Sequence, residues 1–215
     1  HLLMLRARLS FDQLVGNGVG YQAGDKAAVQ KMRRDGFSSA ICGNHIMRAG
    51  KHWATFIFGG EGSGFQSVGV IRPLPGWDQR RLRGWDVFDP SARIFLDDLR
   101  RERTTRWEGD VHLCYFCHTI GQCYYSDWEG ANQKSIWEGV DDYDCRNEKL
   151  GLLLDLDIGT LSVYQNGQKL GTLKDGLAGV YCWIAGFIGS YGSGSASIER
   201  GYDVTDVQAE EYKSA

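Results

Sequence analysis

Two aspartates, Asp155 and Asp157, stand two positions apart in the stretch LLLDLDIGTLSVYQNGQKLG, residues 152–171. On an extended strand they share one face at about 6.6 Å, because each residue advances ~3.3 Å. Glycosidases use two carboxylates about 5 to 9.5 Å apart, and the pair must flank the scissile bond. Two acids side by side on one strand do not flank a sugar, and Asp157 precedes a glycine turn where aspartates accept backbone N–H bonds. The pattern therefore favours carboxylates that shape a hairpin over a catalytic pair.

The stretch CYFCH, residues 114–118, matches the Cys-x-x-Cys-His pattern of haem attachment. With His112 and further cysteines nearby, it is also compatible with a zinc site. A strand, however, places Cys114 and Cys117 on opposite faces, because their spacing is odd. They cannot then converge on one metal ion or one haem edge. We expect buried, apolar cysteines here and no metal.

Other motifs for catalysis or cofactors are weak or absent. GVGYQA, residues 18–23, has the form G-x-G-x-x-A, but no convincing strand precedes it and no acidic residue follows near 20 positions on. The chain has no G-x-S-x-G, and no serine or cysteine can be paired with a histidine by sequence. We therefore expect no catalytic residue and no cofactor.

Composition limits the partners. The chain has 215 residues, a net charge of −3 and a pI of about 6.0, which disfavours nucleic acid as a partner. No apolar stretch approaches the ~20 residues of a membrane helix, so we expect no membrane partner. Six cysteines in a chain that can fold without disulfides favour a reducing compartment, and the cytoplasm is the expected location. The first residue is His1, so we expect a part of a larger multidomain chain.

Alternating apolar residues predict strands and few helices. Residues 151–173 predict a three-strand antiparallel meander, because leucines alternate before Ile158-Gly159 and Asn166-Gly167 is a strong hairpin signal. DKAAVQKM fits either helix or strand, and VTDVQAEEYKSA fits a short helix or a frayed end. Many strands without intervening helices predict an all-β, two-sheet antiparallel sandwich. The remaining strand candidates are 52–58, 67–71, 110–118, 180–188 and 195–199.

We expect one domain over residues 1–200 and a C-terminal tail over 201–215. The segment at about 73–106 carries eight arginines mixed with acidic residues, and it predicts a long solvated insertion. Its arginines could contact phosphates or an acidic peptide, but pairing with the nearby aspartates is the favoured interpretation.

Two stretches carry a family resemblance. LGLLLDLDIGTLSVYQNGQKLGTLKDGLAGVYCWIAGF resembles the C-terminal half of SPRY domains, and HIMRAGKHWATFIF followed by SVGVIRPL resembles their earlier half. The resemblance covers about residues 40–72 and 107–200, and the arginine-rich insertion departs from it. It implies a concanavalin A-like jelly roll that binds a peptide or loop of another protein through loops at one pole and has no catalysis of its own.

Loop aromatics and an arginine are the candidate partner-binding residues. Trp53 and Trp183 lie in predicted strands and are assigned to the core, whereas Trp77 and Trp128 lie in glycine- and charge-bearing loops, where an exposed ring needs a partner. The hypothesis also keeps open that Trp128 packs under its own loop. The resemblance adds the late turn GSYGSG with Tyr191. The full set is Arg72, Trp77, Tyr124, Tyr125, Trp128 and Tyr191.

Two other functions remain open. A carbohydrate-binding, lectin-like domain would use the same exposed aromatics to stack on sugar rings. A lectin-like hydrolase is a weaker alternative, because hydrolases that resemble this sandwich place a further carboxylate downstream on the same strand, where this chain has Gly159 and Thr160.

Overall fold

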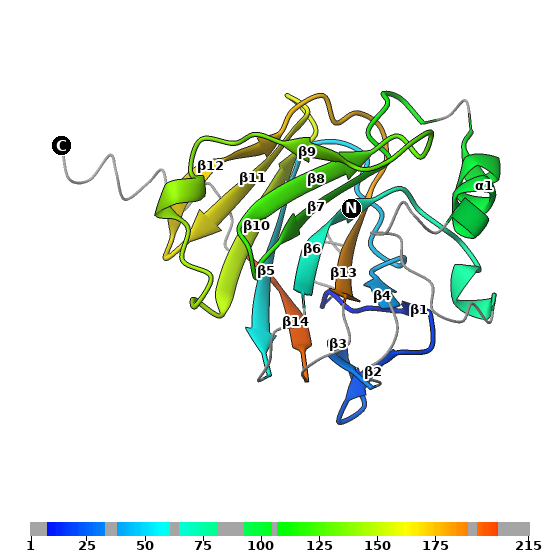
Figure 1. Cartoon of the computed structure of the whole chain (residues 1–215), viewed down its shortest axis with the longest axis horizontal. Coiled ribbons are helices and arrows are strands. Elements are labelled where there is room, and N and C mark those ends of the chain that lie inside the picture. Colours follow the sequence, from blue (N-terminus) through cyan, green and yellow to red (C-terminus); the bar gives the residue numbers. More distant parts are fainter. Residues whose placement is uncertain are drawn as a thin grey trace.

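The structure, a computed structural model, describes residues 8–32, 38–60, 65–80, 93–104, 107–188 and 193–201. In these ranges the chain forms two 7-stranded antiparallel sheets that pack face to face, and one α-helix (Figure 1). The predicted all-β sandwich is therefore confirmed. None of the helices in these ranges combines the length and the hydropathy that a membrane span needs.

Each sheet mixes strands that are distant in the sequence. The first sheet has the spatial order β1 (Gln13–Val15), β4 (Ser38–Ile41), β13 (Cys182–Ile188), β6 (Phe65–Ile71), β7 (Leu113–Cys117), β8 (Gln122–Ser126), β9 (Gln133–Ser135). The second sheet has the order β12 (Gln168–Lys174), β11 (Thr160–Gln165), β10 (Lys149–Asp155), β5 (Lys51–Gly59), β14 (Ser195–Arg200), β3 (Asp25–Lys31), β2 (Val19–Gln22). All five remaining strand candidates form strands, and DKAAVQKM forms β3. The helical elements are η2 (Trp77–Gln79), α1 (Arg93–Glu102) and η3 (Val140–Asp142).

The main core lies between the two sheets. Alternate residues of facing strands fill it, and the rings of Phe56 and Trp183 meet there with centroids 6.1 Å apart. The core assignment of Trp183 is confirmed, but that of Trp53 is wrong. Because Ala54 and Phe56 point inward, the two-residue period turns Trp53 outward. Its half-buried ring lies against Tyr164 on the outer face of the second sheet, at 4.5 Å between centroids.

A second apolar cluster covers the outer face of the first sheet. Ile41, Ile71 and Ile184 project from the sheet and pack with Trp77 and Leu99. Figure 1 shows α1 lying to the right of β4 and β13. The prediction of a solvated insertion over 73–106 is therefore wrong for Leu74, Trp77 and Leu99, which are buried because η2 and α1 fold back onto the sheet. Arg80, Arg101 and Arg103 in the same ranges are exposed. Residues 81–92, 105–106 and the tail after Gly201 lie outside the described residues.

The predicted meander is present as β10, β11 and β12. Leu152 of β10 pairs with Val163 of β11, and β11 pairs in turn with β12. The turn residues Asn166 and Gly167 have φ of 52° and 78°, the positive values that an Asn-Gly hairpin requires.

We predict that Gly167→Val lowers the free energy of unfolding by ~1 kcal/mol or more, because a β-branched residue resists positive φ. A Cβ at Gly167 would meet no atom within 4 Å, so the cost is conformational. Gly130→Val is the matched control, because its Cβ also meets open space and its φ is not positive. Urea denaturation of both variants measures the difference, and an equal effect of the two would refute the turn argument.

Candidate functional site

Arg72 directly follows β6 and marks one end of the sandwich. Ile71, the last residue of β6, pairs with Cys182 at the start of β13 and with Leu113 at the start of β7. We call this end the Arg72 pole. The loops that gather there comprise residues 42–50, 72–80, 107–112, 127–132, 156–159 and 175–181.

The Arg72 side chain is fully buried, not exposed in a loop as the partner-binding hypothesis supposed. Its Nη1 donates to the carbonyl oxygens of Ala178 and Val180, at 2.7 and 3.1 Å. Its Nη2 donates to the carbonyl oxygens of Glu108 and Gly109, the latter at 3.4 Å. One guanidinium thus joins the loop before β7 to the loop before β13.

Two aromatic rings complete the surroundings of this cation. The guanidinium carbon lies 4.3 Å from the ring centroid of Tyr181 and 5.7 Å from that of Trp107. Arg72 makes no ion pair with another described residue. Burial lowers the pKa of Arg72 from its ordinary value, but a guanidinium stays protonated in proteins. Carbonyl dipoles and ring faces therefore stabilise the charge in place of water and of a carboxylate.

The two aspartates at this pole build a turn. Asp155 Oδ1 accepts a hydrogen bond from the backbone N–H of Asp157 at 3.1 Å, and Asp155 also pairs with Lys51 Nζ at 3.6 Å. Asp157 Oδ1 accepts from the N–H of Gly50 at 3.0 Å. Both carboxylates are thus engaged with the chain itself, in agreement with the predicted hairpin-shaping role.

Backbone hydrogen bonds connect this turn to the rest of the pole. The N–H of Leu177 donates to Gly159 at 3.0 Å, and Met47 pairs with Tyr181 in an isolated bridge. The hydroxyl of Tyr181 donates to the carbonyl oxygen of Val111 at 2.7 Å. The loops 42–50, 107–112, 156–159 and 175–181 therefore form one continuous network with Arg72.

Among the side chains of this network that reach the surface, two large aliphatic ones and one tryptophan could contact a partner. Ile158 is 71% exposed, Ile46 is 39% exposed, and Trp107 is half-buried beside Arg72. None of the three is among the residues expected from the sequence. Two of them, Ile46 and Ile158, are apolar residues in turns or loops, and this is the sequence signal that could have identified them. Trp107 required knowledge of its neighbours, because its sequence context does not differ from that of other tryptophans.

The two tryptophans expected at an interface are buried, each with 1% of its surface exposed. Trp77 lies in η2, where its Nε1 donates to Glu102 of α1 at 3.0 Å. Trp128 lies under its own loop, the alternative that the sequence left open. The expected exposure is wrong because α1 covers both rings.

Tyr124 and Tyr125 lie within β8 instead of in a loop, and they point to opposite faces. Tyr124 stacks on Tyr115 on the outer face of the first sheet, at 5.4 Å between centroids. Tyr125 points toward the inner core, with Lys174 Nζ 4.7 Å from its ring centroid. Their predicted position in a loop is therefore wrong.

Tyr191 lies outside the described residues. Strand β13, which precedes it, ends at the end of the sandwich opposite the Arg72 pole. Strand β14, which follows it, begins there. Ile188, the last residue of β13, pairs with Phe65 at the start of β6, whereas Arg72 follows the end of β6. The strand ends thus do not support the expected grouping of Tyr191 with Arg72 and Trp128.

The cysteines of CYFCH follow the two-residue period. Cys114 faces the inner core, with its Sγ 3.7 Å from Cys123 Sγ, and Cys117 faces the other side of β7. The predicted opposite orientation is confirmed. Within the described ranges, no three His, Cys, Asp or Glu side chains gather in a way that could hold a metal ion.

A cluster of three rings lies next to Arg72. His112 packs edge-to-face against Trp107 and Trp128, with centroids 5.4 and 5.1 Å away. Neither ring nitrogen of His112 has a hydrogen-bond partner, and the residue is 3% exposed. Burial, aided by the charges of Arg72 and Arg103, lowers the pKa of His112 from 6.5 to about 4. His112 is therefore neutral at physiological pH.

We predict that Arg72→Met lowers the free energy of unfolding by ~3 kcal/mol, because four backbone carbonyl oxygens lose the donors that join two loops of the pole. Arg101→Met should change it by less than ~0.5 kcal/mol, since the Arg101 side chain is 77% exposed. Equilibrium urea unfolding compares the two variants. Similar losses would contradict the structural role of Arg72.

We predict that stability falls as the pH decreases from about 6.5 toward about 4. Histidines whose pKa is lowered on folding bind protons more strongly in the unfolded chain, so their stabilisation is present above pH 6.5 and lost through this window. The pKa values of His45 and His118 are also lowered to about 4. His112→Phe should therefore reduce the pH slope of the unfolding free energy by about one proton. An unchanged slope would show that His112 is not buried in the neutral form.

Comparison with solved structures finds the same fold elsewhere. The SPRY domain of human HERC1 matches with a TM-score of 0.56 at 12% identity, covering 92% of this chain and 99% of that chain. The TRIM65 PSpry domain gives a TM-score of 0.50 at 15% identity, covering 92% and 93%. Stonustoxin gives 0.51 at 13% identity, covering 89% of this chain but only 26% of that chain.

No family model and no curated protein matches the sequence. The similarity therefore lies in the fold: the two antiparallel sheets match the two SPRY structures over 92% of the chain. The chain folds as a SPRY-type domain.

Proposed function

We propose that the chain is a non-enzymatic module that binds a segment of a partner protein through the Arg72 pole. The resemblance to SPRY domains implies binding of this kind. The observation that carries the proposal is the buried Arg72 guanidinium, which joins two loops of the pole by hydrogen bonds to backbone carbonyls.

A preformed pole lowers the entropy lost on binding, because the loops are already ordered before the partner arrives. The apolar side chains of Ile46 and Ile158 project from this ordered frame, and the half-buried ring of Trp107 lies within it. A few exposed apolar and aromatic residues on a rigid support commonly supply most of the energy of an interface.

The non-enzymatic part of the proposal rests on the carboxylates. Asp155 and Asp157 accept backbone hydrogen bonds within one turn, so they do not face each other across a substrate site.

The six cysteines are all free, which suits a reducing compartment. We therefore propose the cytoplasm as the location, and an adaptor role for the domain.

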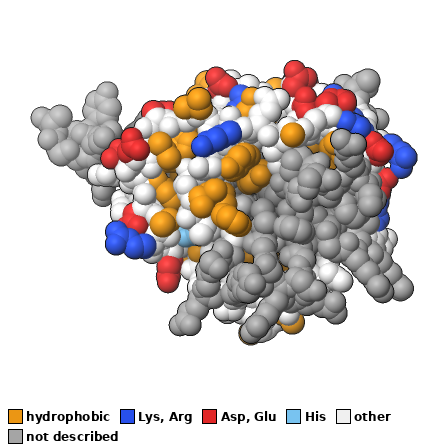
Figure 2. Space-filling view, viewed as in Figure 1, with side chains coloured by type: hydrophobic (Ala, Val, Ile, Leu, Met, Phe, Trp, Pro, Cys, Tyr) orange, Lys and Arg blue, Asp and Glu red, His pale blue; other side chains and the backbone are white. Residues whose placement is uncertain are grey.

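The test compares two exposed isoleucines. Exposed apolar side chains also occur away from the pole: Figure 2 shows hydrophobic side chains gathered in the middle of the face that it views, and Ile136, after β9, is 95% exposed. Because β9 runs away from the Arg72 pole, Ile136→Asp is the matched control for Ile158→Asp.

A partner captured by the wild-type domain is purified, and its dissociation constant is measured for each variant. We predict that Ile158→Asp weakens binding about tenfold or more, because a charge replaces a contact in the interface. Ile136→Asp should bind like the wild type, and both variants should keep the wild-type melting temperature. Equal binding by Ile158→Asp would place the interface elsewhere. Specific binding to a glycan array, lost in Ile158→Asp, would favour the carbohydrate-binding alternative.

A further inference from the structure

Four buried polar atoms at the Arg72 pole have no hydrogen-bond partner in the described chain. They are Arg72 Nε, Trp128 Nε1 and both ring nitrogens of His112. These residues are almost completely buried, with 0%, 1% and 3% of their surfaces exposed. Nearly all buried polar atoms of folded proteins are paired, so each exception requires an explanation. Four exceptions in three neighbouring residues require a common one.

The indole of Trp107 connects these three residues. Its ring centroid lies 5.4 Å from that of His112, 5.5 Å from that of Trp128 and 5.7 Å from the guanidinium carbon of Arg72. The backbone N–H of Arg72 also donates to the carbonyl oxygen of His112 at 2.9 Å, so these two residues lie side by side. We call Arg72, Trp107, His112 and Trp128 the Trp107 cluster.

The Trp107 cluster offers hydrogen-bond donors and a positive charge. Both Nη atoms of Arg72 donate to backbone carbonyls, which leaves Nε–H as the unused donor of the guanidinium. Trp128 adds its indole N–H, and a neutral imidazole at His112 adds one further N–H. Arg72 makes no ion pair with another described residue. A carboxylate has both the charge and the acceptor oxygens that such a cluster requires.

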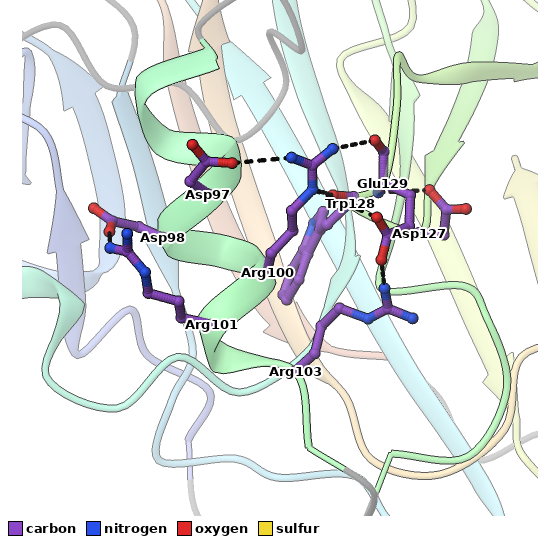
Figure 3. Close-up of polar contacts among 8 residues, drawn as sticks. All are labelled: Asp97, Asp98, Arg100, Arg101, Arg103, Asp127, Trp128 and Glu129. Carbon is purple, nitrogen blue, oxygen red and sulfur yellow. Dashed lines mark hydrogen bonds and ion pairs between the residues drawn. The ribbon is translucent and has the colours of Figure 1, made fainter.

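The acidic side chains next to Trp128 are engaged elsewhere (Figure 3). The Glu129 carboxylate pairs with Arg103 and lies 3.5 Å from Arg100 Nε. Asp127 Oδ1 accepts a hydrogen bond from the backbone N–H of Glu129 at 2.9 Å. Neither carboxylate pairs with the buried guanidinium of the Trp107 cluster, which therefore stays without an acidic partner.

The backbone of Trp128 is strained. Its φ of 61° lies in the left-handed region, which is unfavourable for a bulky residue. Two hydrogen bonds hold this conformation: the N–H of Trp128 donates to Ser126 Oγ at 3.0 Å, and its carbonyl oxygen accepts from Arg100 Nε at 3.1 Å. Such strain is found at ligand sites, where it fixes the position of a functional side chain. Here it holds the indole beside His112, with its N–H unused.

We propose that the Trp107 cluster binds a carboxylate that the partner protein supplies from an aspartate or glutamate side chain. The carboxylate accepts hydrogen bonds from the unused donors and compensates the charge of Arg72. Trp107 is half-buried whereas the other three residues are buried, so the ligand enters beside its ring. This inference rests on the binding role proposed for the pole. It adds one acidic side chain to the apolar groups that contact Ile46 and Ile158.

Acetate is the probe, because it carries the carboxylate without the rest of a partner. It is titrated into the whole chain to about 0.1 M at constant ionic strength, which saturates a site with a Kd of about 1 mM. We expect a saturable shift of the Trp128 Nε1–H resonance in nuclear magnetic resonance spectra, and none with acetamide, the neutral analogue. The Nε1–H of Trp183 is the internal control, because it is also buried and unpaired but lies in the main core.

Two histidine variants test the cluster separately. His112→Phe removes the ring nitrogens but keeps an aromatic ring, so the fold is retained. We expect it to weaken acetate binding about tenfold or more, the loss of a hydrogen bond to a charged group. His118→Phe is the matched control, because His118 is also buried but follows the end of β7 opposite the Arg72 pole. This variant should bind acetate like the wild type.

The purified partner provides the second measurement. Acidic residues of its binding segment are replaced one at a time by the corresponding amides. We expect one replacement to weaken binding to the wild-type domain about tenfold or more, and to have a much smaller effect on binding to His112→Phe.

Two results would overturn the inference. One is a Trp128 resonance that shifts no more than that of Trp183, because water would then satisfy the donors in place of a carboxylate. The other is a partner that tolerates every amide replacement although Ile158→Asp weakens its binding. In that case the pole binds the partner and only the carboxylate site is wrong, whereas unchanged binding by Ile158→Asp would contradict the proposed function itself.

Discussion

A guanidinium without a carboxylate is buried at one end of this domain, and the arrangement of that end depends on it. Removing a cation from water costs several kcal/mol unless polar groups replace the water. For Arg72 those groups are backbone carbonyls of two loops and the faces of Tyr181 and Trp107. Neither loop can move away without leaving a charge unsolvated, so the cation holds both in one position. Gly179, with a φ of 84°, fits this requirement, because a Cβ there would lie 3.0 Å from Arg72 Nη1.

Arg72 also connects the pole to the packing on the outer face of the first sheet. Trp107 contacts both Arg72 and the ring pair of His112 and Trp128, and Trp128 belongs to the cluster that α1 covers. The ordered loops and the covered sheet face therefore share residues. In contrast, Ile46 and Ile158 are 39% and 71% exposed, which makes them available to a partner.

The fold could be predicted from the sequence because its main signals are local. Alternating leucines before Asn166-Gly167 specify strands and a turn without reference to distant residues. Burial of Trp77 and Trp128 could not be predicted in this way, because it depends on a helix that folds back from a segment rich in arginine. The spacing of Leu96 and Leu99 was a signal for that helix, but the surrounding charges favoured a solvated loop.

The binding residues were harder to predict than the strands. Tyr124 and Tyr125 were placed in a loop because the start of β8 could not be located from the sequence. The position of Arg72 after its strand was predicted correctly. An arginine in a loop is nevertheless expected to be exposed unless its carbonyl partners are known. Those partners come from positions more than 30 residues away, Glu108 being 36 and Val180 108 residues distant.

The most direct test of this account is nuclear magnetic resonance of the Arg72 side chain at about pH 7. The hydrogen-bonded Nη protons should appear as separate resonances that exchange slowly with water, because each Nη of the buried guanidinium donates to two backbone carbonyls and its rotation is hindered. A single averaged signal that exchanges as fast as that of the exposed Arg101 would contradict the claim that Arg72 holds the pole together.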